Sequence, residues 1–244
     1  MRRRFFVDHF EAGSAVLSGD AAEHLGRVLR AGQGQLYELS DGQRVWLGRV
    51  ERVALSKRGE NRIEFSLVEP IPAAVPRLLI DLLLSIVKFD RLEWCLEKAT
   101  ELGATNVVPL AAARTDKPLI AAAGKRRERW ERILLESAQQ SRRLRPPVLR
   151  QFSTPAQAFA ECRADVKVIL SERRDAPSFR EILGTRSAAA AAALAIGPEG
   201  GWTDDELAAA RAAKFAEASL GENILRTETA VLASMAILAY ALGG

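Results

Sequence analysis

Cysteine and histidine are scarce in this chain of 244 residues, which contains two of each. Two distant cysteines cannot form a disulfide framework, and such thiols are typical of a reducing compartment, so we expect a cytoplasmic protein. Because the cysteines and histidines are scattered, no metal-ligand spacing exists and no metal is expected. Long apolar runs are also missing, so the sequence predicts no membrane-spanning segment.

Positive charge is concentrated in one window of the chain. The net charge is +4, yet residues 114–150 alone carry 11 basic side chains against 4 acidic ones, an excess of 7. A local basic patch of this kind indicates a polyanionic partner such as nucleic acid. The alternative is a solvated helix in which Glu128, Glu131 and Glu136 neutralise the neighbouring arginines.

The first 70 residues are typical of a small β-rich unit. A short helix is expected over 19–29, and strand-like runs separated by polar turns occupy 35–39, 45–50 and 62–68. Pro70, Pro72 and Pro76 then indicate a stiff linker. We therefore expect domains at 1–70 and 77–244, joined by residues 71–76.

After the linker, strands and helices alternate, which predicts an α/β domain with a parallel sheet. Strands are expected at 78–87, 106–110, 166–170, 192–196 and 216–220, and helices at 125–141 and 228–242. Further helices are expected to begin at two capping boxes, Asp90 with Glu93 and Thr203 with Glu206. The alanine-rich stretch 187–193 is interpreted as a connection. The last helix is apolar nearly all round, which places it in the core or in a subunit interface.

Two glycine-marked turns follow consecutive strands near the C-terminus. Residues 197–201 read Gly-Pro-Glu-Gly-Gly, and residues 220–226 read Leu-Gly-Glu-Asn-Ile-Leu-Arg. Glycine lets backbone approach a ligand closely, and parallel sheets bind ligands at the carboxyl ends of their strands. The spacing matches neither a dinucleotide fingerprint nor a phosphate loop. The turns therefore predict one pocket made largely of backbone.

Three longer motifs carry a family resemblance over nearly the whole chain. They are 197–202, 220–230 and 98–103 (Lys-Ala-Thr-Glu-Leu-Gly), supported by 4–7 and 24–30 near the start. Together they closely resemble the SPOUT-class family that methylates N3 of a uridine in 16S ribosomal RNA of the small subunit. The resemblance implies a PUA-like RNA-binding β-barrel, then a SPOUT domain with a C-terminal trefoil knot. It also implies a homodimer and S-adenosyl-L-methionine as methyl donor.

The resemblance also assigns residues to the methyl donor. Three loops would hold it, after the strand at 166–170 and at the two glycine turns. The residues concerned are Leu170, Ser171, Ile196, Gly197, Pro198, Glu199, Gly200, Gly201, Leu220, Gly221, Asn223, Ile224 and Leu225.

For catalysis, Arg226 is the candidate cation that stabilises charge growing on the uracil oxygens. The alternative for Arg226 is a salt bridge to Glu222 or Glu228. Glu199 is either a base, a hydrogen-bond partner or a cap of the turn, and no general base is assigned.

RNA contacts are expected from side chains of the small domain and of the basic window. They are Arg2, Arg3, Arg4, Arg27, Arg30, Gln140, Arg142, Arg143 and Arg145. Where the family commonly has Glu-Gln-Ser-Gly-Arg, this chain has Gln139 and Arg142 in place of the glutamate and the glycine. The departure leaves the catalytic role of this segment open.

Other functions remain possible from the sequence. A SPOUT enzyme can methylate a ribose 2′-hydroxyl or another position of ribosomal or transfer RNA, and an assembly factor can keep the fold to bind RNA without catalysis. A nicotinamide oxidoreductase is disfavoured because the dinucleotide fingerprint is missing.

Overall fold

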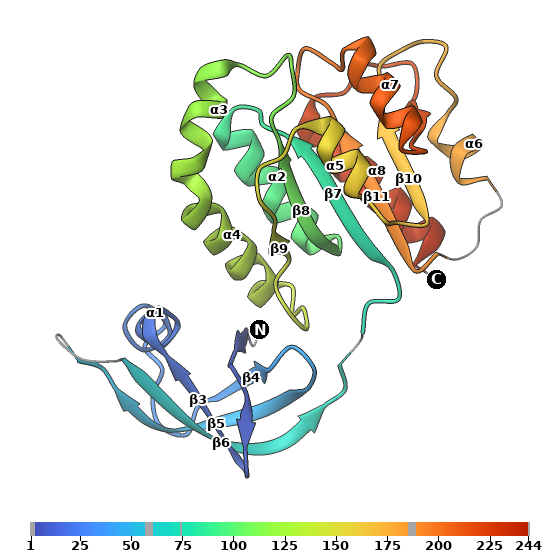
Figure 1. Ribbon diagram of the computed structural model, residues 1–244. Coiled ribbons are helices and arrows are strands. Elements are labelled where there is room, and N and C mark those ends of the chain that lie inside the picture. The colour runs from blue at the N-terminus through green and yellow to red at the C-terminus, as the bar shows by residue number, and fades with distance from the viewer. Residues whose placement is uncertain (1–2, 57–60, 74, 185–188, 244) are drawn as a thin grey trace. The chain divides into compact units, whose positions relative to one another are not determined.

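The chain forms two compact units in the computed structural model, which describes residues 3–56, 61–73, 75–184 and 189–243 (Figure 1). The first unit contains Met1–Val75 together with Ala138–Pro146, and the second contains Pro76–Ser137 together with Pro147–Gly244. The boundary between Val75 and Pro76 falls inside the proline-rich stretch. The inclusion of Ala138–Pro146 in the first unit was not expected from the sequence.

A curled, mixed six-stranded sheet, shaped as a half-barrel, forms the first unit. Its strand order is β1-β4-β5-β6-β3-β2, and only β1 and β4 pair in parallel. The strands are β1 (Arg4–Phe6), β2 (Phe10–Glu11), β3 (Ser14–Ser18), β4 (Leu36–Ser40), β5 (Val45–Ala54) and β6 (Arg62–Ile71). The helix expected over 19–29 occurs as α1 (Gly19–Glu23) followed by a π-helical turn over His24–Val28.

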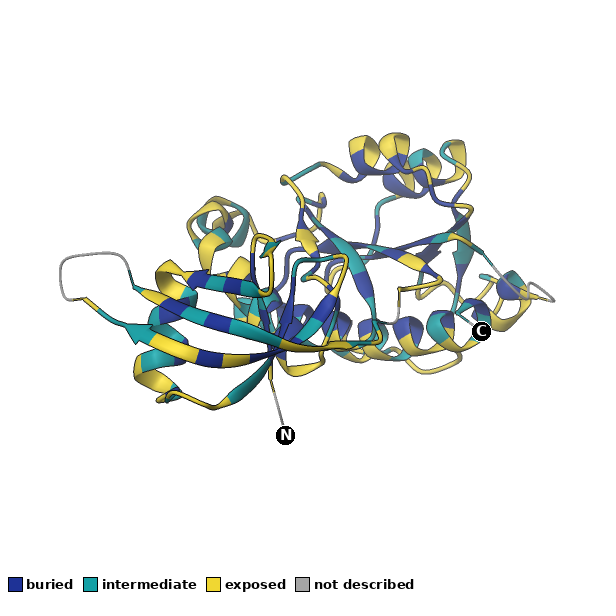
Figure 2. Cartoon of the chain, turned by 90° about the horizontal axis from the view of Figure 1, so that it is seen from below, coloured by how far each residue is buried: buried dark blue, intermediate teal, exposed yellow. Residues whose placement is uncertain are grey.

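Side chains on one face of this sheet form the core of the first unit. Phe5, Leu39, Ile63 and Phe65 are almost completely buried there, together with Leu25 from the π-helical turn. Buried and exposed residues alternate along the strands (Figure 2). That alternation is expected of a sheet with one face in the core and one in water.

The second unit contains an all-parallel six-stranded sheet, as the sequence predicted. Its strand order is β12-β10-β11-β7-β8-β9. The strands are β7 (Leu79–Ser85), β8 (Ala104–Leu110), β9 (Val148–Leu149), β10 (Val166–Leu170), β11 (Ala191–Ile196) and β12 (Ala216–Ala218). After β9, at one edge of the sheet, the chain therefore crosses back past β8, β7 and β11 before it forms β10. The trefoil knot stays a prediction.

Helices cover both faces of this sheet and create two cores. Leu82, Leu84 and Leu194 point toward α2, α4 and α8, whereas Leu83 and Ala195 point toward α5 and α7. The helices are α2 (Phe89–Glu101), α3 (Lys117–Ala123), α4 (Arg127–Gln140), α5 (Pro155–Glu161), α6 (Phe179–Leu183), α7 (Asp204–Ala212) and α8 (Thr227–Leu242). Apolar residues on both faces explain why the central strands read as nearly continuous apolar runs.

Two local predictions were wrong. Asp90 does not cap α2: the helix begins at Phe89, and the Glu93 carboxylate instead accepts from Arg129 Nε at 2.7 Å. The alanines at 191–193 are not a connection but the start of β11, because alanine is small enough to be buried between helices on both faces of a central strand. Residues 187–188 of that stretch lie outside the described residues. The sequence also missed α3, β9, α5 and α6.

Candidate active site

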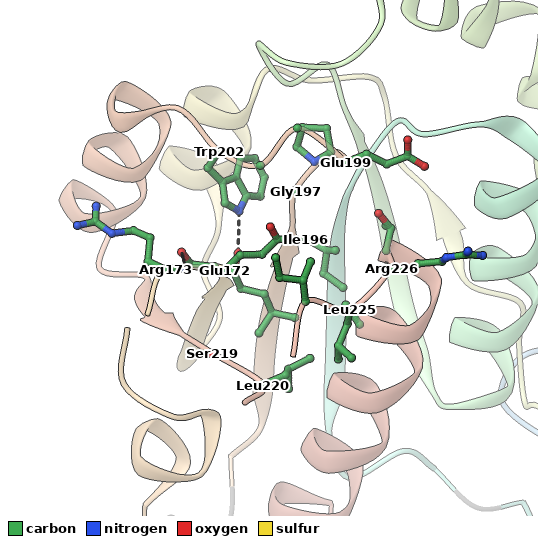
Figure 3. Close-up of a pocket in the computed structure, with 18 of the residues that line it drawn as sticks. Glu172, Arg173, Ile196, Gly197, Glu199, Trp202, Ser219, Leu220, Leu225 and Arg226 are labelled. Atoms are coloured by element: carbon green, nitrogen blue, oxygen red, sulfur yellow. Dashed lines mark hydrogen bonds between the residues drawn. The ribbon is translucent and has the colours of Figure 1, made fainter. Parts of the chain in front are cut away.

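Three loops meet at the carboxyl edge of the parallel sheet and enclose a cavity of about 940 Å³. They follow β10, β11 and β12, and β10 is the strand between the other two. Because parallel strands end at the same edge, loops separated along the chain lie side by side (Figure 3). The cavity is thus a consequence of strand order.

The loop after β11 is held in place by bonds from other elements. The buried Trp202 donates from Nε1 to the carbonyl of Leu170 at 2.9 Å (Figure 3). Arg114, which follows β8, donates from Nη1 to the carbonyls of Gly200 and Trp202 at 3.0 and 3.1 Å. Gly201 has φ of +72°, a conformation that favours glycine. Hydrogen bonds from within the protein therefore hold this wall of the cavity in place.

The predicted capping box at the start of α7 is confirmed. Thr203 Oγ1 accepts from the backbone N–H of Glu206, whose carboxylate accepts from the backbone N–H of Thr203 at 2.8 Å. The same carboxylate accepts from the backbone N–H of Ala113 at 2.8 Å. Glu206 therefore joins the start of α7 to the chain after β8.

The loop after β12 has fewer supports. Ser219 Oγ donates to the carbonyl of Gly221 and accepts from its N–H, and Gly221 has φ of +127°. Beyond this turn, residues 221–224 are exposed, and the side chain of Ile224 is 77% exposed. An apolar side chain this open is available to a bound molecule.

The third loop, after β10, contributes Arg173 to the cavity lining, and this arginine forms an ion pair with Asp175 of the same loop. Arg173 donates from Nε and Nη2 to the two carboxylate oxygens of Asp175, at 3.2 Å each. The Arg173 guanidinium holds the pKa of the Asp175 carboxyl below its usual range, and the pKa of Arg173 is raised by the same contact. Ser171 Oγ accepts from the N–H of Arg173 at 3.2 Å.

All thirteen residues that the sequence assigned to the methyl donor line this one cavity. Their role stays a prediction, but the structure brings them together from three loops. The sequence missed several other lining residues, which include Arg91, Arg114, Glu172, Arg173, Trp202, Ser219, Glu222 and Thr227. The position of Arg91 and Arg114 just beyond β7 and β8 was the available signal, since those strands end at the same edge.

Arg226 lies at the N-terminal cap of α8 and lines the cavity. Its side chain is exposed and extends away from Ile196 and Leu220 (Figure 3). Within the described residues it forms no ion pair with Glu222 or Glu228, so the structure does not show the salt bridge considered as the alternative. The guanidinium is therefore open to a ligand.

Glu199 forms an ion pair rather than a cap of its own turn. Its Oε1 accepts from Nη1 of Arg91, and Nε of Arg91 also lies 3.9 Å from Glu228. The carboxylate of Glu199 is thus tied to α2, on the rim of the cavity.

The described residues predicted to contact RNA all belong to the first unit. Exposed side chains are those of Arg3, Arg27, Arg30, Gln140, Arg142 and Arg145, and Arg143 is half-buried. Arg2 lies outside the described residues. Arg27 also forms an ion pair with Glu23 at 2.9 Å.

Arg4 is not placed for contact with RNA. It is 7% exposed, and its Nη2 and Nε donate to the Glu38 carboxylate at 2.9 and 3.2 Å. Its Nη1 donates to the carbonyl of Arg142. A buried arginine needs such partners, and these partners fasten the segment 138–146 to the half-barrel.

Arg142 occupies a backbone conformation that glycine prefers. Its φ is +54°, in the left-handed region that favours glycine, so the sequence departure at this position places a side chain where glycine is unstrained. The arginine side chain gains a contact that glycine lacks, because its Nη1 lies 3.6 Å from Oε1 of the buried Glu38.

Acidic side chains from inside and outside the basic window partly neutralise it. Arg127 pairs with Glu131 at 2.9 Å, and Arg129 pairs with Glu93 at 2.7 Å. The Arg127–Glu131 pair supports the solvated-helix interpretation for α4, whereas Glu93 is a partner from α2 that the sequence did not suggest. That interpretation does not extend to the basic side chains at 142–145, because they belong to the first unit, whereas the first turns of α4 belong to the second.

No cluster of three or more metal-ligating side chains, and no helix long and apolar enough to cross a membrane, occurs in the part of the chain that the structure describes. Both cysteines are free and buried. Burial, and next the charge of Glu228, raise the pKa of Cys95 to about 12, so this thiol stays protonated and unreactive at neutral pH.

Sequence comparison assigns the chain to a family. A model described as an RNA methyltransferase domain matches residues 75–239. The ribosomal RNA small subunit methyltransferase E of Synechocystis is 33% identical over 217 residues, which cover 87% of this chain and 68% of that protein. The chain belongs to the ribosomal RNA small subunit methyltransferase E family.

Solved structures of similar proteins agree over the full length. The family's enzyme from Neisseria gonorrhoeae, bound to S-adenosyl methionine, has a TM-score of 0.85 at 29% identity and covers 100% of this chain and 99% of its own. A methyltransferase from Legionella pneumophila, in complex with the same cofactor, has a TM-score of 0.86 at 27% identity, covering 100% and 99%. The α/β fold with its preceding half-barrel is therefore that of the family.

Proposed function

We propose that this protein transfers a methyl group from S-adenosyl-L-methionine to N3 of a uridine in 16S ribosomal RNA of the small subunit. The observation that carries the proposal is the single cavity at the carboxyl edge of the sheet, lined by both glycine turns and by Arg226. Family membership supports the ribosomal substrate, because the relatives are named small-subunit ribosomal RNA methyltransferases.

The cavity residues fit the cofactor. Backbone of the glycine turns offers donors and acceptors for an adenine edge, and the side chains of Ile196, Leu220 and Leu225 offer apolar walls. The side chain of Ile224 is 77% exposed, so it is free to pack over a bound molecule. When bound, S-adenosylmethionine supplies an activated sulfonium methyl group.

The residues of this chain must then orient the uracil and support its charge. N3 is protonated at neutral pH, and as its proton is lost, negative charge spreads to the neighbouring oxygens. Arg226 projects from the cavity wall without an ion-pair partner among the described side chains, so its guanidinium is available to donate to those oxygens. Glu199 is tied to Arg91, which favours a role in holding the loop.

The first unit supplies the electrostatic contact with RNA. We propose that Arg3, Arg27, Arg30, Gln140, Arg142, Arg143 and Arg145 bind the phosphate backbone around the target. Arginine donors to phosphates position an RNA without reading its sequence. Segment 138–146 contributes to this surface because Arg4 and Glu38 hold it on the half-barrel.

A homodimer is part of the proposal. Leu232, Ile237 and Tyr240 lie along α8 and are 39%, 39% and 92% exposed. Several solvent-exposed apolar side chains on one helix are typical of a protein interface. Light scattering should give twice the mass of one chain, and Leu232→Glu should give one chain mass with an intact fold.

The decisive test is nucleoside mass spectrometry of ribosomal RNA from cells with and without the gene. Loss of one 3-methyluridine is expected, and it should return when the wild-type gene is restored. Loss of a 2′-O-methylated nucleoside would assign the cavity to ribose methylation. Binding of S-adenosylmethionine without any change in RNA modification would indicate an assembly factor. The cytoplasm, where thiols stay reduced and ribosomes assemble, is the proposed location.

A further inference from the structure

Arg91 lies between acidic side chains from two separate segments of the second unit, of which Glu199 lines the cavity. It is the third residue of α2, and its side chain is 28% exposed. Its Nη1 donates to Oε1 of Glu199, and its Nε lies 3.9 Å from Oε1 of Glu228. Glu199 belongs to the loop after β11, whereas Glu228 belongs to the first turn of α8. The guanidinium of Arg91 therefore faces the carboxylates of both Glu199 and Glu228.

The charges in this group do not balance. Two carboxylates share one cation, and Oε2 of Glu228 is buried without a hydrogen-bond partner among the described residues. A buried acceptor that lacks a partner is costly, so the position of Glu228 depends on the nearby positive charge of Arg91. Without Arg91, both carboxylates would lose their shared cation.

The two carboxylates are close in sequence to the residues that matter for the reaction. Glu199 directly precedes Gly200 and Gly201 of the cavity wall, and Glu228 follows Arg226 by two residues. Helix α2 packs against α8 within the second unit. Arg91 is thus placed to set the distance between the glycine loop and the helix start that carries Arg226.

We propose that Arg91 is a positioning residue for methyl transfer, which holds the start of α8, and with it Arg226, in register with the loop after β11. This inference rests on the proposed function of the same cavity. Arg114 and Trp202 hold that loop independently of Arg91. Loss of Arg91 therefore displaces Arg226 more than the cofactor-binding backbone, and the effect falls on kcat.

The test compares purified Arg91→Met, Arg91→Lys and Arg129→Met proteins. Arg129 is the matched control, because it is an arginine of the same unit that pairs with Glu93 and does not line the cavity. A displacement of about 1 Å can lower a rate by about 100-fold, so we expect kcat of Arg91→Met to fall by at least about 30-fold. The dissociation constant for S-adenosylmethionine should change by less than about threefold, which is under 1 kcal/mol.

Two comparisons separate positioning from general stability. Arg91→Lys keeps the positive charge but not the fork of donors that faces both carboxylates, so it should recover only part of the rate, whereas Arg129→Met should behave as wild type. Loss of Arg91 removes the partner of Glu199, so Arg91→Met combined with Glu199→Gln should be no slower than the slower single variant. If the losses of rate in the two single variants were additive in the double variant, the coupling between Arg91 and Glu199 would be overturned.

Hydrogen exchange supplies a measurement that does not depend on activity. Arg91→Met should increase exchange both at Gly201, whose N–H donates to the carbonyl of Pro198, and in the first turn of α8 at Ala230, whose N–H donates to the carbonyl of Arg226, and leave α5 unchanged. Unchanged exchange in the first turn of α8 would overturn the inference. So would a parallel loss of kcat, cofactor affinity and melting temperature. A wild-type product other than 3-methyluridine would contradict the proposed function alone, since the Arg91 ratios apply to whichever methyl product forms.

Discussion

The two glycine turns of the cavity differ in how many hydrogen bonds they receive from other elements of the fold. The turn after β11 receives bonds from α2, from the chain after β8 and from its own tryptophan, which reaches the end of β10. The turn after β12 is bonded mainly near Ser219, and its residues 221–224 are exposed. The difference indicates one wall that is formed in advance and one that a ligand completes. Four predictions test this comparison.

Trp202→Ala should have the largest effect, because it damages the preformed wall. The indole is 8% exposed, packs against Phe159 at 5.9 Å between ring centroids and donates to Leu170. Removing a buried tryptophan costs about 3–5 kcal/mol of unfolding free energy. Calorimetry should therefore show a melting temperature lower by about 10 °C. Trp94→Ala, at a position 39% exposed, should lower it much less. Equal losses would argue against a preformed wall.

Arg226→Ala should remove activity without removing the fold, because it lies on the open side. Loss of one donor to developing negative charge costs about 100- to 1000-fold in kcat. Methyl incorporation into ribosomal RNA measures this, with Arg163→Ala as the control outside the cavity. Cofactor binding and melting temperature should stay at wild-type values. Wild-type turnover by Arg226→Ala would remove its catalytic role.

Thr203→Ala should cost about 1 kcal/mol of unfolding free energy by loss of the α7 cap. Thr154→Ala is a matched control, because Thr154 forms the same capping box with Gln157 on α5, away from the cavity. Both should lose similar stability in denaturant titrations. Only Thr203→Ala should also weaken S-adenosylmethionine binding, by about fivefold, since the cap anchors the preformed wall. If the two variants bound S-adenosylmethionine equally well, the α7 cap would be shown not to support the cavity.

Ile224→Ser should have the smallest effect on stability. A change at a 77% exposed position is expected to alter the unfolding free energy of the free protein by less than about 0.5 kcal/mol. With S-adenosylmethionine present, the stabilisation measured by thermal shift should be smaller than in wild type, because the bound molecule loses an apolar contact. Identical shifts would show that the open wall does not close on the ligand.

Much of the fold follows from local patterns. Strand-like runs separated by polar turns predicted the β-rich first unit, continuous apolar runs predicted buried parallel strands, and Thr203 with Glu206 predicted the start of α7. Asp90 misled the same reasoning, because its neighbour Glu93 is drawn to Arg129 of another helix. Capping depends on local geometry, but a longer-range ion pair can remove one partner of the box.

The sequence alone determined the two glycine turns, the alternation of strands and helices in the second unit and the resemblance that named a cofactor. Only the tertiary structure decided which side chains support those turns. Arg91 meets Glu199 across 108 positions of the chain, Arg114 meets Gly200 across 86, and Arg4 meets Arg142 across 138. Propensity and periodicity act over a few residues, whereas these contacts arise because strand order and packing bring distant segments together.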